Sequence, residues 1–180
     1  MSILCVFHPS SPDLPNKVLT HHDDIAATLA EQGVCFSHSP LELRVRPGSS
    51  QADVLDACRG YLDQLMTAQG CAAFTLLNRD GVDPTQVDVR DEHVHDSDEV
   101  FAVVTGRAQI GLRLGEYVYA VLCEKGDQLM LPAGTRRWVE LGDNPFCLAL
   151  RLFASEQGVQ PRFTGDAAAR AFLGFDELSV

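Results

Sequence analysis

Short apolar runs typical of β-strands recur from Cys71 onward, and glycine-containing turns separate most of them. The runs are Ala73–Leu77, Glu99–Thr105, Ala108–Leu114, Tyr117–Leu122, Gln128–Leu131, Arg137–Leu141 and Cys147–Phe153. Many short strands at regular spacing are typical of a β-sandwich or a β-barrel. Because Phe101–Val104 and Tyr117–Leu122 are apolar on both faces, we expect these strands to be covered on each side.

Two helices are predicted in the first 70 residues, and they could supply that cover. Apolar side chains four residues apart indicate the first helix, and an apolar stripe between Ser50, the expected N-cap, and Gly70, the expected stop, indicates the second. The elements expected here are a strand over Leu4–His8, a helix over His22–Gln32, a strand over Leu41–Arg46 and a helix over Gln51–Gln69.

These patterns predict one mainly β domain of the α+β class over residues 1–180. We expect a helical and mixed cover over residues 1–70, a barrel over residues 71–166 and a tail over residues 167–180. A short helix is expected over Asp166–Leu173, where the tail begins.

The charge balance disfavours two classes of partner. With 14 basic and 25 acidic side chains, the chain has a formal net charge of −11 and repels phosphate backbones and anionic membranes. The apolar stretches are far shorter than the ~20 residues of a spanning helix, and the N-terminus lacks the basic residues of a signal peptide. We therefore expect no nucleic-acid or membrane partner and a cytoplasmic location, with most or all of the six scattered cysteines as small buried hydrophobes.

The segment Asp91–Glu99, DEHVHDSDE, carries the clearest chemical pattern. On a strand, side chains two residues apart point the same way, so His93 and His95 would face one side, and Glu99 could reach the same point after a short loop. Two imidazoles and one carboxylate form the facial triad of non-haem iron sites, which leaves positions open for substrate and O2. A solvated acidic loop with two surface histidines is the competing interpretation.

This segment is one of several motifs spread over residues 91–166. They are Glu92–Val100 (EHVHDSDEV), Val121–Asp127 (VLCEKGD), Leu131–Thr135 (LPAGT) with Trp138, Arg151–Phe153 (RLF) and Phe163–Asp166 (FTGD). Together they resemble the motifs of the acireductone dioxygenases, a family within the cupins. The resemblance covers nearly the whole chain.

The resemblance implies a double-stranded β-helix, the cupin barrel, that binds one Fe(II) or Ni(II) ion per chain through His93, His95 and Glu99. It implies a monomeric enzyme of methionine salvage whose partners are a methylthio-acireductone and O2. The iron form would yield the keto-acid precursor of methionine and formate. The nickel form would yield methylthiopropanoate, formate and carbon monoxide. The metal would hold the enediolate as a Lewis acid.

Two positions depart from the family's pattern. The family has a fourth ligand, a histidine, where this chain has Arg137, and an arginine where this chain has Phe101. A guanidinium stays protonated and cannot ligate a metal. Pointing inward, Arg137 would oppose a divalent ion, pair with Glu99 or bind an anionic substrate. If Arg137 instead points outward, like its neighbour Arg136, it would be a surface residue. His93, His95 and Glu99 would then remain as a weaker metal site with three ligands.

Arg151 matches a family arginine near the pocket, although an exposed strand arginine is an equally good interpretation. We therefore expect a metal-dependent dioxygenase with altered ligation, and with Arg151 and Arg137 in its pocket. One alternative is a catalytically degenerate cupin that binds a small molecule or a protein partner. Another is a different three-ligand oxygenase or isomerase on the same barrel.

Overall fold

The computed structural model describes residues 1–85 and 89–179, so residues 86–88 of the predicted barrel and residue 180 of the predicted tail lie outside the described residues. The strands are β1 (Ile3–Phe7), β2 (Lys17–Leu19), β3 (Cys35–His38), β4 (Ala73–Asp80), β5 (His93–Val94), β6 (Glu99–Leu114), β7 (Tyr117–Glu124), β8 (Asp127–Leu131), β9 (Arg136–Glu140), β10 (Phe146–Phe153) and β11 (Arg162–Phe163). The helices are α1 (His22–Ala30), α2 (Gln51–Gln69) and α3 (Phe175–Leu178), with short 3-10 helices at η1 (Glu156–Val159) and η2 (Ala168–Ala171).

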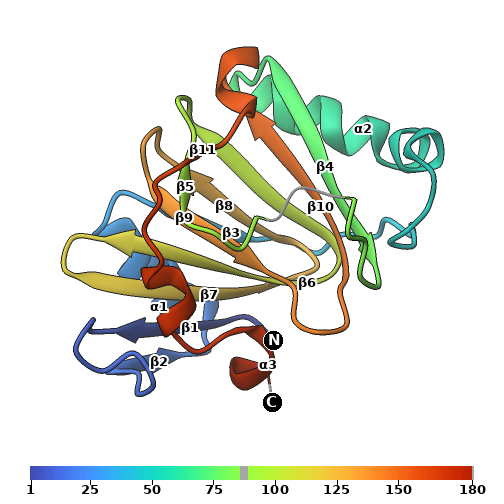
Figure 1. Ribbon diagram of the computed structural model, residues 1–180. Helices are drawn as coiled ribbons and strands as arrows, with labels where there is room; N and C mark the ends of the chain where they lie inside the picture. The colour runs from blue at the N-terminus through green and yellow to red at the C-terminus, as the bar shows by residue number, and fades with distance from the viewer. Residues whose placement is uncertain (86–88, 180) are drawn as a thin grey trace.

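The strands form two antiparallel layers that share the long strand β6 (Figure 1). One layer follows the order β11–β5–β9–β6–β7–β1–β2, and the other follows β4–β10–β6–β8–β3. The two strands expected over Glu99–Thr105 and Ala108–Leu114 are one strand, because β6 passes from layer to layer through an irregularity opposite Leu148 and Ala149. The prediction of a mainly β, barrel-like fold with N-terminal helices is confirmed.

Alternate residues of β6 and β10 belong to different hydrophobic clusters. The outward set packs against α2 and contains Val100, Ala102, Val104, Leu148, Leu150 and Leu152. The inward set fills the barrel and includes Phe101, Val103, Cys147 and Ala149. Glu99 and Arg151 have the parity of the inward set, so the alternation of a β-strand places both side chains in the barrel interior.

The second helix has the predicted boundaries. Its N-cap, Ser50, accepts a hydrogen bond from the backbone N–H of Asp53 at 3.2 Å, and Gly70 closes it in the left-handed conformation with a φ of 65°. Figure 1 shows α2 lying along the layer that contains β4 and β10. The first helix, α1, ends at Ala30, two residues before the predicted end.

The strand expected over Leu41–Arg46 is absent from the structure. Leu43 and Val45 pack at the edge of the α2 cluster, which explains their apolar alternation. Their backbone carbonyls accept hydrogen bonds from the side chains of Lys125 and Thr105, so the segment is held by side chains rather than by a neighbouring strand.

The tail covers the outer face of the layer that contains β7 and β9. The helix expected over Asp166–Leu173 is reduced to η2, and Ala169 and Phe172 pack with Phe7 and Trp138. The first 70 residues also contribute the strands β1–β3 to the two layers. Within the described residues, no helix is both long and apolar enough to cross a membrane.

Candidate functional site

Two buried imidazoles lie side by side at one end of the barrel. His93 is on β5, between Arg137 of β9 and Phe163 of β11 in the strand register, and His95 follows directly after this strand. Their ring centroids are 5.3 Å apart, and the rings are nearly perpendicular, at 81°. The structure therefore brings together the two histidines that the sequence pattern paired.

Backbone carbonyls orient both rings. Nδ1 of His93 lies 2.8 Å from the carbonyl oxygen of Asp91, and Nδ1 of His95 lies 2.7 Å from that of Gly158. Because a carbonyl oxygen only accepts, these contacts assign the proton of each neutral ring to Nδ1 and leave the lone pair on Nε2. This orientation is common among metal-binding histidines.

Gly158 reaches His95 only because it has no side chain. A Cβ at this position would lie 1.9 Å from Oγ of Ser97, so a larger residue would push η1 away from the imidazole. Sequence reasoning missed Gly158 and the carbonyl of Asp91 as orienting groups. A backbone acceptor 63 residues away from His95 leaves no side-chain signal in the sequence.

The environment keeps both imidazoles neutral. Burial lowers the pKa of His93 to about 4, and the nearby charge of Arg151 acts in the same direction. Burial also lowers the pKa of His95. Nε2 of His93 is buried and has no hydrogen-bond partner among the described residues, so it presents an unused lone pair.

The third predicted ligand, Glu99, is held by two arginines. Nη1 of Arg137 lies 2.5 Å from its Oε2, and Nε and Nη2 of Arg151 lie 2.6 Å from Oε1 and 3.1 Å from Oε2. Burial acts to raise the pKa of Glu99, but the charges of Arg151 and Arg137 outweigh it and lower this pKa to about 2. The carboxylate is therefore ionised, and both of its oxygens accept hydrogen bonds from the two arginines.

Strand alternation explains why Arg137 points inward. Its neighbour Trp138 packs against the tail on the outer face of β9, so Arg137 and Val139 face the interior. The arginine is fully buried, and its Nε and Nη2 also donate to the carbonyls of Thr135 and Pro132. The interpretation of Arg137 as a surface residue is wrong.

Arg151 also belongs to the interior, where it contacts a predicted ligand directly. Its Nη2 lies 3.2 Å from Nε2 of His95, and its guanidinium lies over the rings of Phe101 and Phe153 at 5.7 and 5.8 Å. The interpretation of Arg151 as an exposed strand residue is therefore wrong. Phe101 forms part of the surface on which this guanidinium rests.

As arranged here, the five side chains do not fit a divalent metal ion. The Nε2 lone pair of His95 and both oxygens of Glu99 accept hydrogen bonds from guanidinium groups, and only Nε2 of His93 is unused. With two arginines, one carboxylate and two neutral imidazoles, the cluster has a net charge of about +1, which repels a cation and attracts an anion.

A cavity of about 620 Å³ opens beside this cluster. Arg151, His95 and Arg79 line it, together with apolar side chains such as Leu77 and Phe163. Its size and its mixture of apolar and cationic groups suit a small organic anion.

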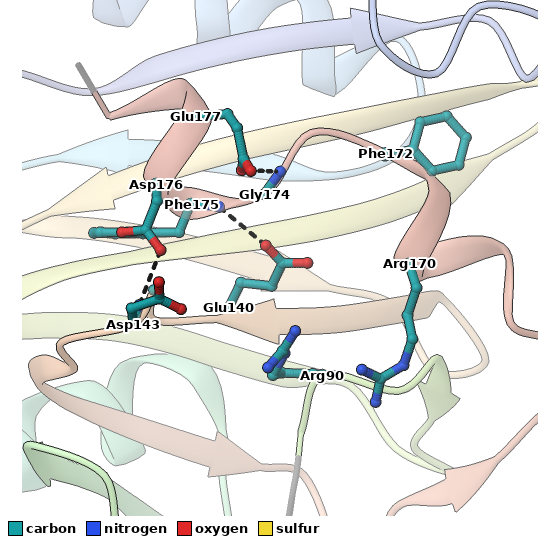
Figure 2. Close-up of a pocket in the computed structure, with 10 residues that line it drawn as sticks. Arg90, Glu140, Asp143, Arg170, Phe172, Gly174, Phe175, Asp176 and Glu177 are labelled. Carbon is teal, nitrogen blue, oxygen red and sulfur yellow. Dashed lines mark hydrogen bonds between the residues drawn. The ribbon is translucent and has the colours of Figure 1, made fainter.

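A second, polar hollow of about 280 Å³ lies where the tail meets the end of β9, and Figure 2 shows its lining. The tail closes it through hydrogen bonds from the N–H of Phe175 to Glu140 and from the N–H of Asp143 to Asp176. None of the five predicted site residues lines this hollow. These hydrogen bonds hold the tail against the barrel, and the hollow lies apart from the candidate site.

Comparisons with known proteins agree with this architecture. A profile of the ARD/ARD' family matches residues 15–161. An acireductone dioxygenase of Pseudomonas fluorescens (strain Pf-5) is 48% identical over 98% of this chain and 100% of its own length. One of Pseudomonas syringae pv. syringae is 45% identical over 96% of this chain and 97% of its own.

A solved structure shows the same fold. The acireductone dioxygenase from Bacillus anthracis with cadmium ion in its active center superposes with a TM-score of 0.72. The match covers 91% of this chain and 98% of the other at 19% identity.

Proposed function

Since the chain belongs to the ARD/ARD' family, we propose that it is a dioxygenase that oxidises a methylthio-acireductone with O2 to a keto acid and formate. The main support is the similarity to acireductone dioxygenases over nearly the full length of both chains. The oriented pair His93 and His95, inside a barrel with an adjoining cavity, is the local feature consistent with this activity.

In this proposal the cavity binds the substrate as an enediolate anion. Arg151 and Arg79 supply positive charge, and the apolar wall that includes Leu77 and Phe163 receives the methylthio group. Arg151 is placed to donate hydrogen bonds to the oxygens of the substrate, because its guanidinium lines the cavity beside His95.

The metal is the finer part of the proposal. Fe(II) or Ni(II), bound through His93, His95 and Glu99, would supply Lewis-acid chemistry. For an ion to bind there, Glu99 has to separate from Arg137 and Arg151, and His95 has to give up its contact with Arg151. We therefore propose a metal affinity well below that of a site without such competitors. A monomeric state and a cytoplasmic location also belong to the proposal.

One observation favours a second candidate function. Two guanidinium groups occupy the donor atoms of His95 and Glu99, which is the arrangement expected of a cupin that binds a small anion without metal and without turnover. In this case Arg137 would serve as the permanent internal cation of the barrel.

Oxygen uptake tests these two functions. The purified protein is supplied with Fe(II) or Ni(II), and O2 consumption is followed after addition of a model acireductone. The dioxygenase proposal expects uptake that depends on the added metal and is abolished by His95→Ala. The control is Arg136→Ala, a substitution at an exposed position, which should retain the activity of the wild type.

Metal analysis completes the test. Uptake that does not depend on the added metal, or binding of the acireductone without uptake under either metal, would contradict the dioxygenase proposal. Binding without uptake would support the anion-binding cupin.

A further inference from the structure

A second group of potential ligands lies outside the barrel site, where three distant segments meet. His22 is the first residue of α1, His38 is the last residue of β3, and Asp127 is the first residue of β8. One donor atom from each side chain lies within 4.8 Å of the other two. Among the described residues, this is the group of His, Cys, Asp and Glu side chains that meets this criterion, and the barrel set of His93, His95 and Glu99 does not.

Asp127 is oriented as a one-oxygen ligand. It is fully buried, and its Oδ2 accepts hydrogen bonds from Oγ of Ser2 at 2.6 Å and from the backbone N–H of Glu124 at 2.8 Å. These two donors hold the carboxylate so that Oδ1 faces the imidazoles, 2.7 Å from Nδ1 of His38. Hydrogen bonds that orient a ligand in this way are characteristic of metal centres.

In the part of the chain that the structure describes, no lysine or arginine forms an ion pair with the buried carboxylate of Asp127. Among the described residues, the ion pair of this carboxylate is with the imidazole of His38. With both histidines neutral, the cluster has a net charge of about −1. The barrel site has about +1, so a divalent cation is attracted to His22, His38 and Asp127 and repelled from the barrel.

The two imidazoles are accessible and close to each other. The rings of His22 and His38 stack with centroids 4.2 Å apart, and Nε2 of His22 lies 3.2 Å from Oγ of Ser2. Both residues are partly exposed, so an ion can enter and water can fill a remaining coordination position.

The turn before β8 brings this site together. Gly126 has a φ of 94°, and a Cβ there would lie 2.3 Å from the carbonyl oxygen of Ser39 and 3.3 Å from the His38 ring. A glycine at position 126 therefore lets the chain place His38 against Asp127.

We propose that His22, His38 and Asp127 form a binding site for Zn²⁺ or a similar divalent transition-metal ion. Two imidazole nitrogens and one carboxylate oxygen are a known zinc ligand set, with water as the fourth ligand. Bonds of about 2.0–2.2 Å to a tetrahedral ion place neighbouring donors roughly 3.3 Å apart. The His38–Asp127 contact, at 2.7 Å, has to widen by about 0.6 Å, and the proton on Nδ1 of His38 has to leave this nitrogen.

Zinc titration of chelator-treated protein, in competition with a chromophoric chelator, tests the site. We expect one tight equivalent of Zn²⁺ in the wild-type chain and in the double variant His93→Ala/His95→Ala. His22→Ala and His38→Ala should each weaken this binding by more than about 100-fold, since even loss of an orienting group costs 10–100-fold. The matched control is His21→Ala, at the exposed position next to His22, and this variant should bind Zn²⁺ as tightly as the wild type does.

Either of two results would overturn the proposal. One is an absence of tight zinc binding in the wild type, and the other is binding that survives His22→Ala and His38→Ala but disappears in the barrel double variant. Circular dichroism of His22→Ala checks folding, and this side chain is partly exposed, so its loss should leave the core packed. The readout is binding, so the result is independent of dioxygenase activity.

Discussion

Arg137 gives the interior of the barrel a buried positive charge. Its guanidinium is fully buried, pairs with Glu99 and also donates to two backbone carbonyls. A buried charge is tolerated when it is paired and hydrogen-bonded, and removing one partner of such a pair is strongly destabilising. The arrangement of Glu99 between Arg137 and Arg151 is therefore self-sufficient without a metal ion.

The substitution Arg137→His should raise the affinity of the barrel site for Ni(II) by at least about 100-fold. It removes a unit charge, worth roughly 4 kcal/mol at 4 Å and an effective dielectric constant of 20, and it adds an imidazole lone pair. Calorimetric titration of chelator-treated protein measures the change, with His22→Ala present throughout so that the second proposed metal site does not contribute. Arg136→His, at the exposed neighbouring position, is the control and should leave the affinity of the barrel site unchanged. Equal affinities for the two variants would show that position 137 does not act on a bound ion.

At the scale of elements, the barrel site depends on the short 3-10 helix η1, which acts through its backbone. The 3-10 helix η1 brings the carbonyl of Gly158 to His95, and this approach is close enough that a Cβ would overlap Ser97. Strands β5, β9 and β10 supply His93, Arg137 and Arg151. The loop after β10 therefore sets the orientation of one imidazole, and the strands set the positions of the other groups.

The variant Gly158→Ala should destabilise the protein by about 1–3 kcal/mol, the usual cost of inserting a methyl group into a packed site. It should also release the Nδ1–H of His95 from its carbonyl partner. Denaturant unfolding and the NMR signal of the His95 ring measure the two effects. Gly60→Ala is the control, because an added Cβ at this exposed position in α2 meets no atom within 4 Å. A more favourable helix propensity should stabilise that variant by about 0.5–1 kcal/mol.

At the scale of the whole molecule, the buried site makes stability sensitive to acid. His93 has a pKa of about 4 in the folded protein, whereas an unperturbed histidine has a value of 6.5. Between these values the unfolded chain binds a proton that the folded chain does not, so stability falls as the pH drops. Glu99 extends the effect to lower pH, because its pKa is lowered from 4.5 to about 2 and its stabilising charge is lost over that interval.

The free energy of unfolding of the metal-free protein should therefore decrease by up to about 3 kcal/mol between pH 6.5 and pH 4 on account of His93 alone. His93→Gln should flatten this part of the profile, whereas the exposed-residue variant His21→Gln should keep the slope of the wild type. Urea unfolding at a series of pH values measures both. Parallel profiles for His93→Gln and the wild type would contradict the assignment of this acid sensitivity to His93.

The sequence alone determined the features that depend on local spacing. The α2 helix, with its cap at Ser50 and its stop at Gly70, and most of the barrel strands follow from apolar periodicity and turn residues. The pairing of His93 and His95 follows from their separation by two residues in an extended segment. These features could be predicted because neighbours along the chain determine them.

Only the tertiary structure decided which partners the site residues take. Pairing between strands distant in sequence sets Arg137 and Arg151 against Glu99, and the close approach of η1 sets Gly158 against His95. The meeting of His22, His38 and Asp127 likewise depends on the pairing of β3 with β8 and on the position of α1. Contacts between such distant segments depend on the packing of the whole barrel, so no local pattern in the sequence encodes them.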